Sequence, residues 1–133
     1  MHTLVVLIVV VLLLFLLYMI LIMPRLHKPD CSALLHQYYA HRGLHDLEAG
    51  VPENSMKAFR LAIEKGFGME MDVQLSKDGI PVVFHDATLT RMCSVEKRVN
   101  ELTLAELKQL SLAGTQERIP TFQEFLTLVN GQV

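Results

Sequence analysis

The sequence predicts an α/β fold that follows one transmembrane helix at the N-terminus. Two observations lead to this expectation. Residues 3–23 form an uncharged, strongly apolar run that differs from the rest of the 133-residue chain. After this run, short apolar strands alternate with amphipathic helices and turn signals, which is the pattern of mixed α/β domains.

The run from Thr3 to Met23 is long enough to cross a bilayer as one helix. Its 21 residues would extend about 31 Å as a helix, close to the hydrocarbon thickness of about 30 Å. A cleaved signal peptide should show a basic start, a shorter apolar core and a small-x-small cleavage site, and none of these is present. We therefore expect residues 1–23 to be an uncleaved, single-pass anchor in the cell membrane.

Charged residues flank this anchor unevenly. Arg25 and Lys28 follow it directly, whereas only His2 and the amino terminus precede it. This bias favours a cytoplasmic location for the rest of the chain. Residues 24–34 contain two prolines and indicate a juxtamembrane linker, so the folded domain is expected at residues 35–133.

Composition excludes some classes of function. The two cysteines, Cys31 and Cys93, fit neither a zinc pattern nor a disulfide framework and are expected to be free thiols. The formal net charge of −2 provides no basic field for a polyanion. Binding to nucleic acid is therefore not expected.

The first half of the domain predicts a strand, a helix and a longer strand. A short strand at 38–40 is followed by a loop without periodicity. Residues 55–65 place apolar side chains at helical spacing, with Asn54 or Ser55 as the candidate N-cap. The stretch 68–75 alternates strictly between apolar and polar residues, which indicates a half-buried strand.

The second half predicts a hairpin and two helices. A tight turn at 76–79 joins the longer strand to a second strand at 80–84. Two helices begin at Thr103 and Thr121, each followed three residues later by a glutamate, which is a capping box. This order fits an α/β barrel or a layered fold. Because a barrel of eight units needs roughly 250 residues, we expect the N-terminal part of a TIM (β/α)8 barrel.

Two acidic residues in the longer strand are candidate metal ligands. The alternation puts Glu70 and Asp72 on one face, and apolar side chains on the other, buried face. Two carboxylates on a sheet face are also common as solvated surface. At the carboxyl end of a barrel strand, however, they would point into the mouth, where Mg²⁺ or Ca²⁺ takes oxygen ligands.

Three further residues carry proton-transfer and phosphate-binding chemistry. His41 and His85 can exchange protons near neutral pH, and Arg42 can hold two phosphate oxygens at once. Each also has a structural interpretation, because His41 could simply end a strand and His85 could form a turn with Asp86.

Other polar residues are expected to have structural roles. Asn54 is best explained as a helix cap, and Glu53 as a favourable charge near the helix N-terminus. Three other histidines lie outside any comparable pattern and are expected on the surface: His27, His36 and His45.

Five motifs, in this order and spacing, resemble the N-terminal half of the catalytic domain of the glycerophosphodiester phosphodiesterase family, in its membrane-anchored type. The resemblance covers about residues 39–128. The motifs are His41-Arg42-Gly43, Pro52-Glu53-Asn54-Ser55, Glu70-x-Asp72-Val73, Asp78-Gly79 and Pro81-Val82-Val83-Phe84-His85-Asp86.

The resemblance implies a TIM barrel that uses a divalent metal, Mg²⁺ or Ca²⁺, to hydrolyse glycerophosphodiesters to glycerol 3-phosphate and an alcohol in phospholipid metabolism. It implies that His41 and His85 are the general acid and base and that Arg42 holds the phosphate. Glu70 and Asp72 would be the metal ligands. The family's usual route proceeds through a cyclic phosphate formed by attack of a glycerol hydroxyl. The expected partners are a glycerophosphodiester or lysophospholipid substrate and the membrane.

The family's next strand is expected to lie beyond the last residue. That strand carries a further acidic ligand and a lysine in an acidic-x-Lys pattern, and this sequence stops at 130–133, where the strand would begin. Two alternatives therefore stay open. One is a non-catalytic, truncated, membrane-anchored module of the same family, and the other is a lysophospholipase D-type activity in the complete protein.

Overall fold

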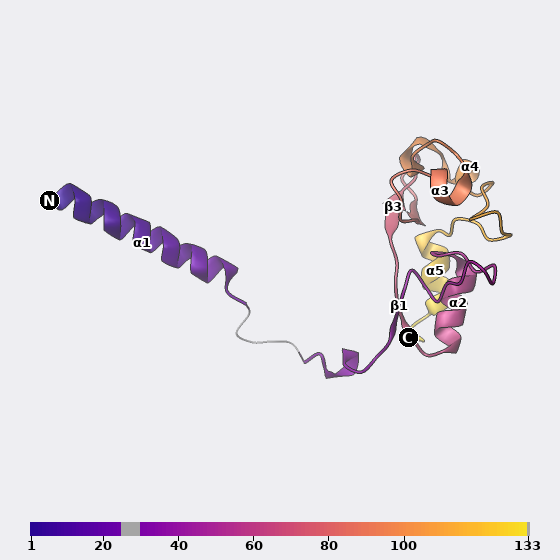
Figure 1. The fold of residues 1–133 in the computed structure, drawn as a ribbon, viewed down its shortest axis with the longest axis horizontal. Helices are drawn as coiled ribbons and strands as arrows, with labels where there is room; N and C mark the ends of the chain where they lie inside the picture. Colours follow the sequence, from indigo (N-terminus) through magenta and orange to yellow (C-terminus); the bar gives the residue numbers. More distant parts are fainter. Residues whose placement is uncertain (25–29, 133) are drawn as a thin grey trace. The chain divides into compact units, whose positions relative to one another are not determined.

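The computed structural model of the protein describes residues 1–24 and 30–132 (Figure 1). The expectations for Arg25, His27 and Lys28, and for the central part of the linker, concern residues outside these ranges. The chain divides into two compact units, Met1–Leu35 and His36–Val133.

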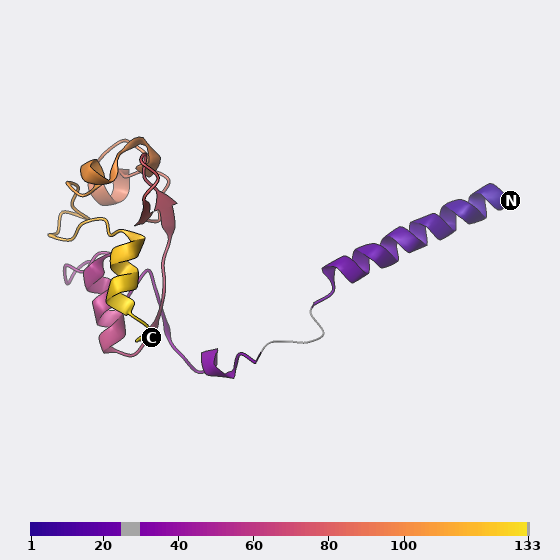
Figure 2. The ribbon, with the colours of Figure 1, turned by 180° about the vertical axis from the view of Figure 1, so that it is seen from behind.

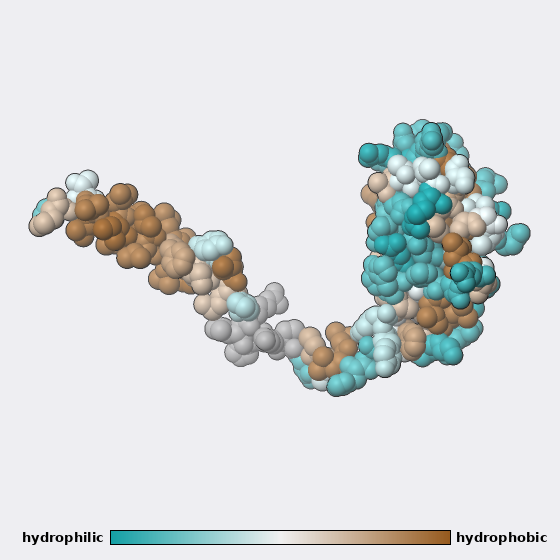
Figure 3. Space-filling model, in the orientation of Figure 1, coloured by the Kyte–Doolittle hydropathy of each residue, from teal (hydrophilic) through white to brown (hydrophobic). Residues whose placement is uncertain are grey.

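The first unit is dominated by one apolar helix. Helix α1, His2–Ile22, has 21 residues, and none of its side chains is buried. The face seen in Figure 3 is apolar along its length. Its length and composition are sufficient to cross a membrane, and a signal sequence would pass the same test. A short 3-10 turn, η1 (Ser32–Leu34), lies at the end of the linker.

The second unit begins with a parallel pair of strands joined through a helix. Strand β1, Tyr39–His41, pairs with β2, Gly68–Glu70, so that His41 lies opposite Glu70. Between them runs α2, Met56–Glu64. Its N-cap is Ser55, whose hydroxyl accepts a hydrogen bond from the backbone N–H of Ala58.

The prediction of one continuous strand at 68–75 is wrong. The structure has two strands there, β2 and β3 (Val73–Leu75), and β3 pairs antiparallel with β4 (Pro81–Val83) in a second sheet. Val73 and Leu75 are 46% and 58% exposed, so the buried face predicted for this stretch ends where the chain leaves the first sheet. The break frees the backbone of Asp72, whose carbonyl accepts a hydrogen bond of 2.9 Å from the N–H of Phe84.

The remaining helices are short except for the last. The predicted starts at Thr103 and Thr121 are confirmed: each hydroxyl accepts from the N–H of the glutamate three residues on, and that glutamate accepts from the threonine N–H. These boxes open α4 (Leu104–Leu107) and α5 (Phe122–Val129). Two turns of helix were not expected, α3 (Thr90–Cys93) and η2 (Val99–Glu101).

The core forms two clusters that meet at β4. Val83 packs with Phe59 of α2 and Phe125 of α5, and the two rings stand edge to face at 4.8 Å. Figures 1 and 2 show these two helices side by side. The neighbouring Val82 belongs to the larger cluster, which contains Val82, Phe84, Leu89, Met92, Val99, Leu102, Leu107, Leu112 and Ile119. Because β4 is anchored in both clusters, the residues at its exit are held firmly.

The described part of the second unit is thus a mixed α/β structure with two two-stranded sheets. The complete barrel stays a prediction.

Candidate active site

The carboxyl ends of β1 and β2 bring two of the predicted residues together. His41 ends β1 and Glu70 ends β2, and the parallel register sets them opposite each other. The Nε2 atom of His41 lies 3.7 Å from Oε2 of Glu70. The same oxygen accepts a hydrogen bond of 3.2 Å from the backbone N–H of Arg42.

The turn after β1 aims Arg42 back toward the strands. Arg42 and Gly43 both have positive φ, +58° and +79°, so the chain reverses within two residues. The backbone N–H of Asn54 donates to the carbonyl of Arg42 at 2.9 Å and fixes the turn. The Arg42 side chain is only 17% exposed; its Nη1 donates to Oε1 of Glu53 at 2.9 Å, and its Nε lies 3.5 Å from Oδ2 of Asp72.

Asn54 has a different role from the cap that the sequence suggested. Ser55 caps α2, whereas Asn54 is buried, has φ of +53°, and donates from Nδ2 to Oδ2 of Asp72 at 3.2 Å. Its position before a helix gives an asparagine the local signature of a cap. The actual partner, Asp72, lies 18 residues away, beyond the reach of any local signal.

Glu70 and Asp72 fit a divalent cation by the chemistry of their free oxygens. Each carboxylate uses one oxygen toward the protein, and the other, Oε1 of Glu70 or Oδ1 of Asp72, accepts no hydrogen bond from any described residue. Oδ1 of Asn54 is buried and likewise has no donor among them. Hard oxygen donors of this kind suit Mg²⁺ or Ca²⁺.

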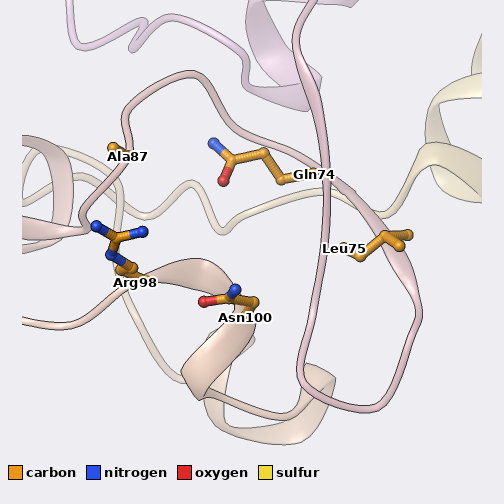
Figure 4. Close-up of a pocket in the computed structure, with 5 residues that line it drawn as sticks. All are labelled: Gln74, Leu75, Ala87, Arg98 and Asn100. Atoms are coloured by element: carbon orange, nitrogen blue, oxygen red, sulfur yellow. The ribbon is translucent and has the colours of Figure 1, made fainter.

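His85 is held by its neighbour and by a glutamine from β3. Its Nδ1 lies 2.7 Å from Oδ1 of Asp86. The Nε2 amide of Gln74 donates to the carbonyls of Phe84, His85 and Asp86 at 2.9, 3.1 and 2.9 Å. Figure 4 shows Gln74 extending toward the loop of Ala87, at a hollow of about 410 Å³. The backbone around His85 is therefore fixed from the side of β3.

Arg91, in the unexpected helix α3, links the two halves of the site. Its Nη2 and Nη1 donate to Oε1 and Oε2 of Glu53 at 2.7 and 3.1 Å. Its Nε and Nη2 donate to Oδ2 and Oδ1 of Asp86 at 2.7 and 2.8 Å. Glu53, expected only as a charge near a helix end, therefore lies between two guanidinium groups, those of Arg42 and Arg91.

These contacts change the acidity of the carboxyl groups. The hydrogen bonds from Arg91, assisted by His85, lower the pKa of Asp86 to about 2. The pKa of Glu53 is also lowered, chiefly by Arg91 and then by Arg42. Both groups are therefore ionised at neutral pH, and the pKa of Arg91 is raised in return.

Glu53, His85 and Asp86 offer ligand atoms that all lie within 4.8 Å of one another, as a metal site would. In this structure Arg91 already bonds all four carboxylate oxygens of Glu53 and Asp86. The guanidinium thus supplies the positive charge that a cation would bring. Glu70 and Asp72, each with a free oxygen, are the better candidates for a metal.

A lowered pKa makes stability depend on pH. Asp86 titrates near 2 in the folded protein instead of 3.8, so its ionised form stabilises the fold above pH about 4 and this contribution is lost as the pH falls toward 2. Because Arg91 is half exposed, we expect about 1 kcal/mol. Asp86→Asn should remove this part of the acid sensitivity, measured by denaturant unfolding between pH 4 and 2.

The control for this measurement is Glu48→Gln, at an exposed loop residue without a side-chain hydrogen bond to the described residues. An acid sensitivity that is the same for Asp86→Asn, the control and the unmodified protein would contradict the prediction.

All five predicted site residues belong to one network of hydrogen bonds and ion pairs. His41, Glu70, Arg42 and Asp72 form one part, and His85 joins it through Asp86, Arg91 and Glu53. The sequence missed Arg91 and the linking roles of Glu53 and Asp86. His36 and His45 are exposed, as expected, and His27 lies outside the described residues.

Comparison with known proteins gives one consistent result. Residues 41–133 match the family described as "Glycerophosphoryl diester phosphodiesterase family". The chain is 45% identical over 98 residues to a glycerophosphodiester phosphodiesterase of Caldanaerobacter subterraneus subsp. tengcongensis, a match that covers 68% of this chain and 39% of the relative. It is 37% identical over 95 residues to human glycerophosphodiester phosphodiesterase 1, covering 64% of this chain and 28% of the relative.

Comparison with solved structures identifies phosphodiesterases as well. An Oleispira antarctica phosphodiesterase, in complex with the product sn-glycerol-3-phosphate, superposes with a TM-score of 0.66 at 38% identity, covering 76% of this chain and 42% of that one. The glycerophosphodiester phosphodiesterase of Thermotoga maritima gives a TM-score of 0.62 at 38% identity, covering 73% and 41%. The chain therefore spans about two fifths or less of the length of these relatives.

Proposed function

Because this chain belongs to the glycerophosphoryl diester phosphodiesterase family, we propose that the protein is a metal-dependent enzyme that hydrolyses glycerophosphodiesters to glycerol 3-phosphate and an alcohol. The observation that carries this proposal is the assembly of two histidines, an arginine and two carboxylates in one network at the ends of β1, β2 and β4. The glycerol 3-phosphate complex of the Oleispira antarctica phosphodiesterase supports this choice of product.

Arg42 would bind the phosphate of the substrate. Its Nη1 and Nε face Glu53 and Asp72, while Nη2 donates to no described residue. A guanidinium held in this way is preorganised, because little side-chain freedom remains to be lost on binding. Glu70 and Asp72 would hold the divalent cation through their free oxygens. When bound, such a cation would act as a Lewis acid toward a phosphoryl oxygen.

The two histidines would move protons. Nδ1 of His85 faces the carboxylate of Asp86 and so carries the proton, which leaves Nε2 to exchange one with the substrate. His41, beside Glu70, would supply the second proton-transfer group. As a glycerol hydroxyl forms a bond to phosphorus, one histidine takes its proton. The other protonates the leaving alcohol as its P–O bond breaks, and water then opens the cyclic phosphate to give glycerol 3-phosphate.

We place this activity at a membrane surface, in phospholipid metabolism. Residues 1–23 would form a single-pass anchor, residues 24–34 a linker, and residues 35–133 the beginning of a TIM-barrel domain on the cytoplasmic side. The exposed apolar surface of α1 supports the anchor, because the apolar side chains of this 21-residue helix, none of them buried, would otherwise face water. The relatives, of which this chain spans less than half, support a domain longer than the region described.

The experiment uses the protein expressed from its complete coding sequence and purified in detergent. Glycerophosphocholine and a lysophospholipid are each supplied with Mg²⁺, with Ca²⁺ or with EDTA. Glycerol 3-phosphate is measured for the first substrate, and lysophosphatidic acid, which keeps the acyl chain, for the second. We expect release with one of the ions and a loss of at least about 100-fold with EDTA, because a Lewis acid contributes several kcal/mol to the transition state. Turnover that EDTA leaves unchanged, or no release of glycerol 3-phosphate from glycerophosphocholine, would contradict the proposal.

A further inference from the structure

We propose that Arg91 is a positioning residue that holds the phosphate-binding Arg42 and the proton-transferring His85 in one fixed arrangement, through the carboxylates of Glu53 and Asp86. The inference rests on the proposed function of this site. It assigns a role to a residue from α3, an element for which the sequence contains no helical signal.

The contacts that Arg91 makes are short and use three of its nitrogens. Four distances, between 2.7 and 3.1 Å, join it to the two oxygens of Glu53 and the two oxygens of Asp86. Paired contacts of this kind fix the orientation of a carboxylate as well as its position. The planar guanidinium therefore sets the angle between the two acidic groups.

Each carboxylate then bonds a residue of the proposed mechanism. Oε1 of Glu53 accepts from Nη1 of Arg42 at 2.9 Å, and Oδ1 of Asp86 lies 2.7 Å from Nδ1 of His85. The result is an unbroken series, Arg42, Glu53, Arg91, Asp86 and His85, in which every contact is a charged hydrogen bond. Arg42 and His85 are 43 residues apart in the sequence, and this series connects their two side chains directly.

Electrostatics explains why the series needs its central arginine. Oxygens of Glu53 and Asp86 lie within 4.8 Å of each other, and two ionised carboxylates at that distance repel. Without Arg91 they would turn apart, and Arg42 and His85 would follow them. A displacement of about 1 Å in a catalytic group costs up to roughly 100-fold in rate.

Stability is not the main effect of these contacts. The Arg91 side chain is 51% exposed, and ion pairs at exposed side chains contribute little to folding. An Arg91 variant should therefore fold, bind the membrane and still lose turnover. This separation between folding and turnover is the signature of a positioning residue.

The test compares Arg91→Met, Arg91→Lys and the control Arg60→Met in the protein expressed from its complete coding sequence. Arg60 lies on the exposed side of α2 and forms no ion pair with the described residues. We expect kcat to fall about 10- to 100-fold in Arg91→Met, with a melting temperature lowered by only about 2–4 °C, as a loss of about 1 kcal/mol implies. The loss should be smaller in Arg91→Lys, because lysine keeps the positive charge, although its ammonium cannot bond both carboxylates in the paired geometry of arginine. Millimolar guanidinium should restore part of the Arg91→Met activity.

A second measurement does not depend on turnover. Nitrogen-15 NMR of the imidazole reports which ring nitrogen of His85 carries the proton. We expect the Nδ1–H form in the unmodified protein and in Arg60→Met, and a mixture of forms in Arg91→Met. Failure of the unmodified protein to release glycerol 3-phosphate would contradict the proposed function and leave this spectrum as the test of Arg91. A kcat or a His85 spectrum of Arg91→Met equal to that of the unmodified protein would overturn the inference.

Discussion

Replacing Glu70 with glutamine is expected to lower the release of glycerol 3-phosphate by about 1,000-fold, corresponding to about 4 kcal/mol of lost transition-state stabilisation. Glutamine keeps the size of the side chain and can still accept the backbone N–H of Arg42, whose bond to Oε2 of Glu70 is 3.2 Å long. It removes the negative charge that a divalent cation needs and the charge beside His41. The measurement is kcat/KM at saturating Mg²⁺ or Ca²⁺.

A matched control is Glu64→Gln. Glu64 is exposed at the last residue of α2 and makes no side-chain hydrogen bond with the described residues. The Glu64→Gln variant should keep full activity. The unmodified protein should be stabilised against heat by the metal, and Glu70→Gln should lose this stabilisation. Equal activity of the two variants would show that the measured turnover has another origin, such as a contaminating hydrolase.

Replacing Gly43 with alanine is expected to destabilise the second unit by about 3 kcal/mol. The φ of Gly43 is +79°, where a side chain costs about 1–2 kcal/mol. A Cβ there would lie 2.9 Å from Cβ of Ala58 and 3.0 Å from Cδ1 of Phe59. Both belong to the buried face of α2, and overpacking of this kind costs about 1–3 kcal/mol. Because the turn orients Arg42, activity should fall as well.

The control for Gly43→Ala separates the cost of the backbone conformation from the cost of the steric clash. Gly79 has a similar φ of +76°, but nothing lies within 4 Å of a Cβ built there. Gly79→Ala should therefore show the backbone cost alone, about 1 kcal/mol. The two variants are compared by denaturant unfolding of the protein expressed from its complete coding sequence. Equal losses in both variants would contradict the packing argument.

Sequence patterns predicted the elements whose signals are local. The capping boxes at Thr103 and Thr121 involve residues three positions apart, and both open helices in the structure. The amphipathic spacing of α2 is equally local. The parallel pairing that sets His41 opposite Glu70 follows from a strand–helix–strand order, since the second strand returns beside the first.

What the sequence could not predict depends on contacts between distant residues. Arg91 lies 38 residues from Glu53, in a four-residue helix too short for any periodicity. The break between β2 and β3 leaves the alternation of residue types intact, because hydrophobicity does not record which neighbour a strand pairs with. For the same reason Val73 and Leu75, expected to be buried, are exposed.

The break in the expected strand has a consequence for metal binding. Glu70 belongs to the first sheet, where His41 also lies, whereas the carbonyl of Asp72 accepts a hydrogen bond from Phe84, which follows the second sheet and precedes His85. The two proposed ligands, separated by one residue, therefore belong to the hydrogen-bonded surroundings of two different sheets. A cation shared by them would therefore connect the two sheets directly, in addition to the contacts of the protein itself. Binding of the metal would thus also stabilise the packing of one sheet beside the other.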